Sequence, residues 1–125
     1  MNPSILILEK DGIQATYLSR QFSKWGYSIF GVFDNELDAF LSLFKSSNIP
    51  TLTIWNLSSQ PTSHFILLRL IYYLCNVRIL IITGLRKNEI APFLPEKIMF
   101  DTLYKPYTNL QLKEKIIFAI SQNHQ

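Results

Sequence analysis

The chain is poor in the residues that build disulfides, zinc sites and phosphate-binding loops. It has one cysteine, two histidines and four dispersed glycines among 125 residues. A single cysteine excludes an internal disulfide, and no second ligand stands at zinc-binding spacing from His64. Without a glycine-rich segment there is also no phosphate-binding loop. We interpret His64, Cys75 and the Ser58-Ser59 pair as ordinary loop, capping or packing residues.

The sequence also lacks a membrane span, a signal segment and a basic cluster. Its longest apolar stretch, from Phe65 to Cys75, is interrupted by Arg69 and is far shorter than the roughly 20 residues that cross a bilayer. No basic segment followed by a long apolar run opens the chain, so we expect a cytoplasmic location. The net charge is +3, but the basic residues are scattered, which argues against a nucleic-acid interface.

Apolar side chains dominate what is present. Hydrophobic residues make up 48% of the chain and charged residues only 17%, a composition that excludes a disordered segment. A chain of this length can bury one core of ordinary size. We therefore predict a single folded domain over residues 1–125.

Short apolar or β-branched runs alternate with helical patterns along the chain. Strands are predicted over residues 4–9, 27–33, 51–55, 78–83 and 97–104. Helices are predicted from Asp11 to Gly26, from Asp34 or Asn35 to Phe44, from the loop 57–63 to Cys75, briefly within 84–94, and from Thr108 or Asn109 to Ser121. The alternation predicts an α/β fold, a doubly wound five-stranded parallel sheet with helices on both faces.

Polar residues follow the strands at one edge of this sheet. In such folds the working site lies beyond the carboxyl ends of the strands. The residues expected there are Glu9, Lys10 and Asp11 after the first strand, Asn56 after the third, Thr83 and Gly84 after the fourth, and Lys105-Pro106 after the fifth.

The order and spacing of four segments resemble the receiver domain of response regulators, the CheY-like domain of two-component signalling. The four segments are Ile5–Asp11, Pro50–Asn56, Ile81–Gly84 and Tyr104–Tyr107. The resemblance implies a flavodoxin-like (βα)5 fold with strand order 2-1-3-4-5, and a cis peptide bond before Pro106. It also assigns Glu9 to the first acidic position, Lys10 to the metal-coordinating position, Asn56 to the phosphoacceptor, Thr83 to the switch hydroxyl and Lys105 to the conserved lysine.

Two of these positions are wrong for phosphoryl chemistry. An amide at Asn56 cannot form an acyl phosphate, and an ammonium at Lys10 replaces an anionic oxygen ligand of Mg²⁺. Thr102 also stands where the family commonly has an aromatic switch residue. We therefore expect a degenerate pseudo-receiver that is not an enzyme, binds no Mg²⁺ or other cofactor, and acts through protein partners.

Alternatives remain. Asp11 could serve as a substitute phosphoacceptor, although it is better placed to cap the first helix. A small flavodoxin-like enzyme is a further alternative. If the pocket is degenerate, we expect Lys10 to replace the metal and to hold Glu9 and the Asn56 amide in one charge-neutralised cluster.

Two helices are candidate protein-binding surfaces, including for a homodimer. The helix between Phe65 and Cys75 carries apolar residues on more than one face. The C-terminal helix combines Leu110, Ile117 and Phe118 with Lys113 and Lys115.

Overall fold

The computed structural model describes residues 2–57, 77–91 and 101–121. In these residues the elements follow in the order β1 (Ser4–Leu8), α1 (Gly12–Lys24), β2 (Ser28–Phe33), α2 (Glu36–Lys45), β3 (Leu52–Leu57), β4 (Arg78–Thr83), α4 (Lys87–Ile90), β5 (Asp101–Tyr104) and α5 (Asn109–Ser121). The helix predicted up to Cys75 and residues 97–100 of the fifth predicted strand lie outside the described residues.

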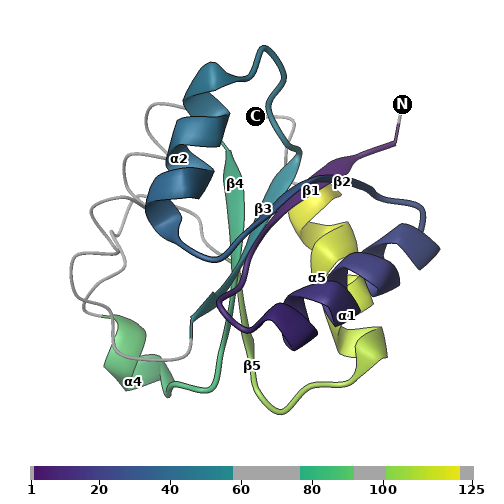
Figure 1. The fold of residues 1–125 in the computed structure, drawn as a ribbon. Coiled ribbons are helices and arrows are strands. Elements are labelled where there is room, and N and C mark those ends of the chain that lie inside the picture. The colour runs from purple at the N-terminus through teal and green to yellow at the C-terminus, as the bar shows by residue number, and fades with distance from the viewer. Residues whose placement is uncertain (1, 58–76, 92–100, 122–125) are drawn as a thin grey trace.

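The strands form one parallel sheet in the order β2-β1-β3-β4-β5. This confirms the predicted fold class and strand order. Figure 1 shows α1 and α5 on one face of the sheet and α2 on the other. Because parallel neighbours need crossover connections, the helices that join them cover both faces.

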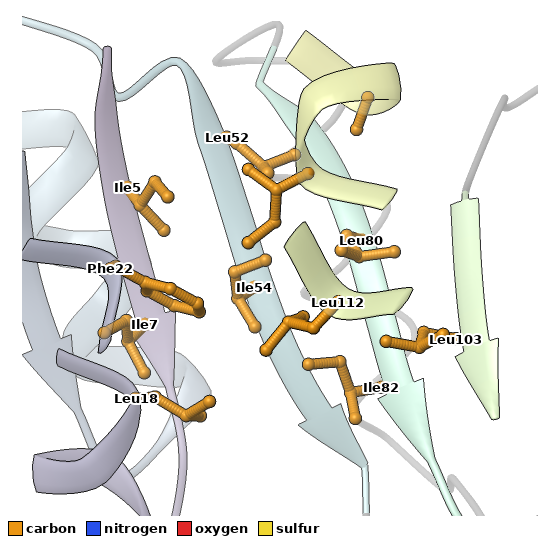
Figure 2. Packing of buried hydrophobic residues seen from close by; sticks show 12 residues of the cluster. Ile5, Ile7, Leu18, Phe22, Leu52, Ile54, Leu80, Ile82, Leu103 and Leu112 are labelled. Carbon is orange, nitrogen blue, oxygen red and sulfur yellow. The ribbon is translucent and has the colours of Figure 1, made fainter. Parts of the chain in front are cut away.

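Alternating side chains on the strands divide the core between the two faces. In β1, Ile5 and Ile7 point to the side of α1 and α5, whereas Leu6 and Leu8 point to the side of α2. Figure 2 shows the first of these clusters, in which Phe22 and Leu112 from the helices lie against strand residues. The clusters share no residue, so each face of the sheet has its own apolar core in the described part of the chain.

The helix ends follow the polar residues that the sequence offers for capping. Asp11 accepts hydrogen bonds from the backbone N–H groups of Ile13 and Gln14, at 2.9 and 3.4 Å. Asn35 caps α2 by accepting from the N–H of Asp38 at 2.8 Å. Gly26, just past α1, has φ of +92°, a backbone conformation that residues with a Cβ rarely adopt.

The third strand is longer than predicted. The sequence suggested an end at Trp55, but β3 continues through Leu57 because Asn56 pairs with Ile82 and Leu57 with Thr83. Asn56 therefore lies inside the strand and not in the loop after it.

No helix in the described ranges is long and apolar enough to cross a membrane.

Candidate functional site

A direct hydrogen bond between Asn56 and Glu9 joins the carboxyl ends of the neighbouring strands β1 and β3. Leu8 lies opposite Trp55 in the sheet, so the next residue of each strand meets its neighbour. The side-chain Nδ2 of Asn56 donates to Oε1 of Glu9. Glu9 is buried, and its backbone N–H is fixed to the carbonyl of Phe33 at 2.9 Å. The Oδ1 atom of Asn56 is buried without a hydrogen-bond partner among the described residues.

Asp11 supports this pair from the start of α1. Its backbone N–H donates to Oε2 of Glu9 at 3.1 Å, so both carboxylate oxygens of Glu9 accept a hydrogen bond. Its own carboxylate caps α1 and points to the backbone of that helix. Asp11 is thus a capping residue, as the sequence indicated.

Lys10 does not take the predicted place. Its side chain is exposed, and no hydrogen bond or ion pair joins it to Glu9 or Asn56 in the part of the chain that the structure describes. The prediction that Lys10 holds these two side chains together is therefore wrong. The pair needs no bridging cation, because a neutral amide can donate directly to the carboxylate.

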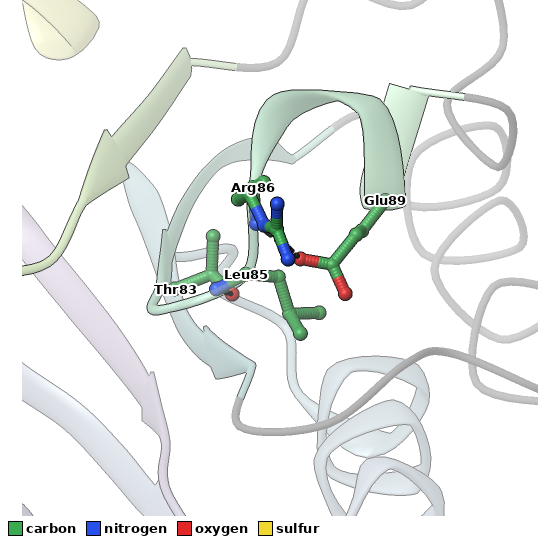
Figure 3. Close-up of polar contacts among 4 residues, drawn as sticks. All are labelled: Thr83, Leu85, Arg86 and Glu89. Atoms are coloured by element: carbon green, nitrogen blue, oxygen red, sulfur yellow. Dashed lines mark hydrogen bonds and ion pairs between the residues drawn. The ribbon is translucent and has the colours of Figure 1, made fainter.

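Thr83 ends β4 with a hydroxyl that is already engaged twice. The residue is fully buried, and Oγ1 donates to the carbonyl of Leu57 at 2.7 Å. The same oxygen accepts from the N–H of Leu85 at 3.0 Å, as Figure 3 shows. The hydroxyl thereby fastens the end of β3 to the loop that leads into α4.

A hydrogen-bonded turn follows this loop. The N–H of Arg86 donates to Oε1 of Glu89 at 2.9 Å, and the N–H of Glu89 returns to the carbonyl of Arg86 at 2.9 Å. The Arg86 Nε and Glu89 Oε1 atoms are 3.5 Å apart (Figure 3). The Arg86 side chain is 85% exposed and that of Glu89 32%, so water screens the charge attraction, which contributes at most about 1 kcal/mol, and the main effect of the pair is to define the start of α4.

Lys105 and Pro106 occupy the end of β5 as predicted, joined by a cis peptide bond. The backbone N–H of Lys105 donates to the carbonyl of Thr83 at 2.8 Å. The Lys105 side chain passes close to Gly84, with its Cδ atom 4.0 Å from where a β-carbon of residue 84 would lie. The side chain is exposed and forms no ion pair with a described residue. Thr102 lies within β5, half-buried and opposite Ile81.

Tyr107 belongs to the Tyr104–Tyr107 segment of the resemblance, but the sequence assigned no role to it. It is half-buried, and burial raises the pKa of its phenol above the ordinary value of 10.0. The charges of Tyr17 and Glu9 raise this pKa further. An aromatic residue directly after Lys-Pro was the available signal.

Comparisons with known proteins identify the architecture. No protein-family model and no curated protein matches the chain. A receiver domain of a modulated diguanylate cyclase from Desulfovibrio desulfuricans matches with a TM-score of 0.77 at 22% identity, covering 98% of this chain and 97% of that one. The chain has the receiver fold.

Two further structures give the same answer. A CheY-like receiver domain from Methanospirillum hungatei matches with a TM-score of 0.81 at 17% identity, covering 98% of this chain and 97% of its own. A two-component response regulator from Clostridium difficile matches with a TM-score of 0.78 at 21% identity, covering 99% and 100%. Identities this low establish the receiver fold, and what the domain does has to be argued from its site.

Proposed function

We propose that this chain is a pseudo-receiver, a non-enzymatic module that binds protein partners without being phosphorylated on aspartate. The observation that supports this most directly is the hydrogen bond from Asn56 to Glu9. The receiver resemblance assigns Asn56 to the phosphoacceptor position. An amide there has no anionic oxygen to attack phosphorus, and its donor is already bound to the neighbouring acid.

The donor set at the strand ends does not fit Mg²⁺. Both oxygens of Glu9 accept hydrogen bonds within the protein, and Lys10, at the position where an oxygen ligand is required, has an exposed ammonium side chain that supplies none. A cation would have to break the bond to Asn56 and tolerate the charge of Lys10. We propose that the site holds neither the metal nor the phosphoryl group.

The switch hydroxyl and the lysine point to one fixed state. The hydroxyl group of Thr83 already donates its hydrogen bond to the Leu57 carbonyl inside the protein. Lys105 extends into solvent with no anionic partner among the described residues. We propose that these groups keep the domain in a single conformation, so that the signal is carried by binding alone.

The C-terminal helix is a candidate surface for a partner. Leu110, Ile117 and Phe118 are each more than half exposed on α5. Beside them lies a pocket of about 420 Å³, lined by residues of β5 and α5 that include Tyr104, Glu114 and Phe118. An apolar surface with charged neighbours is typical of protein interfaces. The other candidate surface, the helix between Phe65 and Cys75, lies outside the described residues. A cytoplasmic location is also part of the proposal.

The deciding experiment is phosphorylation by acetyl phosphate in the presence of Mg²⁺, followed by intact-mass measurement. The wild type should gain no phosphoryl mass. The variant Lys10→Asp/Asn56→Asp, which restores both carboxylates beside Glu9, Thr83 and Lys105, should gain it. Lys10→Asp alone is the matched control and should remain unmodified, because it still lacks the nucleophile.

A Mg²⁺-dependent gain by the wild type would overturn the proposal. Peptide mapping would then show whether Asp11 carries the group, as the alternative acceptor. If neither the wild type nor the restored double variant reacts, while beryllofluoride also leaves the double variant unchanged, the assignment of Asn56 to the acceptor position would be wrong.

A further inference from the structure

Helix α2 carries an apolar stripe that the described residues cover only in part, with Phe44 packed edge-on against Phe40. Leu37, Leu41 and Phe44 are 54%, 41% and 59% exposed. Their spacing of four and three residues places them within an arc of about 60° on the helix surface. The inner face of α2 is a different one, because Ala39 and Leu43 are buried against the sheet. The stripe is therefore apolar surface beyond what the core requires.

Two opposite charges flank this stripe on one side. Asp38 and Lys45 are both exposed and stand seven residues apart, which is close to two helical turns. One oxygen of Asp38 accepts from Asn35 Nδ2 at 2.9 Å, and Lys45 has no ion pair with a described residue. The helix is thus acidic at its start and basic at its end along the same edge of the stripe.

We propose that the α2 stripe binds a second copy of this chain, with the two helices antiparallel about a two-fold axis near Leu41. Antiparallel packing about such an axis brings the same edge of both helices together, in opposite directions. Leu37 of one copy then lies near Phe44 of the other. Asp38 of one copy faces Lys45 of the other, and the symmetry repeats this ion pair. In a parallel arrangement, opposite edges of the two helices would meet, and Asp38 of one copy would not face Lys45 of the other.

Charge complementarity is what selects a second copy over another occupant. A helix whose two charges are placed for self-pairing needs no partner of different sequence. Figure 1 places α2 on the face of the sheet opposite α1 and α5, so the dimer leaves the C-terminal helix open. Three apolar side chains per copy make a small interface, and we expect a weak dimer with a dissociation constant of about 10–100 μM.

The first test measures mass by sedimentation velocity and light scattering across a concentration series of the wild-type chain. Leu41→Glu should raise the dissociation constant more than about tenfold, because it places a charge on the axis in both copies. Ile13→Glu, at an apolar residue of α1 that is 84% exposed, is the matched control and should leave the constant unchanged, and Leu110→Glu tests whether the α5 surface pairs instead. A wild type that stays monomeric at about 1 mM, or a dimer broken by Leu110→Glu and not by Leu41→Glu, would overturn the proposal.

The second test exchanges the charges. Asp38→Lys and Lys45→Asp should each weaken the dimer about five- to tenfold, since each replaces two attractions by two repulsions. The double variant Asp38→Lys/Lys45→Asp should recover most of the wild-type affinity. Circular dichroism melting checks that all variants fold. Recovery in the double variant supports antiparallel pairing, whereas single variants as tight as the wild type, or a double variant as weak as the singles, would refute it.

Discussion

Thr53 and Thr83 provide a matched pair for measuring what a buried hydroxyl contributes to this fold. They lie on the neighbouring strands β3 and β4 and are 1% and 0% exposed. The Thr83 hydroxyl bonds to Leu57 and Leu85, whereas the Thr53 hydroxyl has no hydrogen-bond partner among the described residues. The same substitution, threonine to valine, should therefore destabilise the fold at position 83 and not at position 53.

The expected magnitudes follow from the hydrogen bonds that each change removes. Thr83→Val deletes two hydrogen bonds and leaves the Leu57 carbonyl and the Leu85 N–H without this partner, which should lower the free energy of unfolding by about 2–3 kcal/mol. Thr53→Val removes a desolvated hydroxyl and replaces it with a methyl group, so the free energy should stay unchanged or rise by up to about 1 kcal/mol.

Urea unfolding followed by circular dichroism measures both values. The slope of free energy against urea should be the same for the three proteins, so that differences in midpoint report stability. Thermal melting should give a midpoint roughly 10 °C lower for Thr83→Val. Thr83→Ser keeps the hydroxyl and should lose only about 1 kcal/mol for the missing methyl group. Equal effects of valine at positions 53 and 83 would refute the reasoning.

Three further outcomes test local features of the fold. Asp11→Ala should cost about 1 kcal/mol in thermal denaturation by removing the α1 cap, while Asp34→Ala, at a residue that does not cap a helix, should cost far less. Gly26→Ala should also cost about 1 kcal/mol in urea unfolding, because alanine is strained at positive φ, and an unchanged midpoint would argue against that conformation. Tyr107 has a raised pKa, so its phenol ionises first in the unfolded chain, and stability should fall as pH rises above 10.0. Tyr107→Phe should flatten that decline, as measured by urea midpoints at about pH 9 to 11.

The sheet could be predicted from sequence because each strand and helix is locally consistent with it. The run Ile79–Ile82 is apolar at every position, which suits a strand covered on both faces. Asp11, Asn35 and Gly26 are residues whose conformational preferences alone favour helix ends. The strand order came from the family resemblance, and the register from one strand to the next had no sequence signal.

Side-chain direction at the site was beyond sequence reasoning. Lys10 was expected to turn inward because it stands at the metal-coordinating position of the resemblance, but a long ammonium side chain is more stable in water than in a pocket where an amide already satisfies the acid. The extension of β3 to Leu57 depends on its partner strand, since pairing with Thr83 supplies the backbone contacts. The convergence of Glu9 and Asn56 was predictable, because both stand at the carboxyl ends of neighbouring parallel strands.

The division of the interior into two separate cores has a consequence for the substitutions that the fold tolerates. Because no residue belongs to both clusters, a change in side-chain volume on one face of the sheet is absorbed there and leaves the other face intact. A lineage can therefore exchange the surface above α2 or the surface above α5 one at a time. Solved structures that share only 16% to 22% identity with this chain have the same backbone arrangement, so the fold tolerates wide exchange of side chains. Substitutions on the side of α2 can therefore change that surface while the packing beneath α1 and α5 is kept.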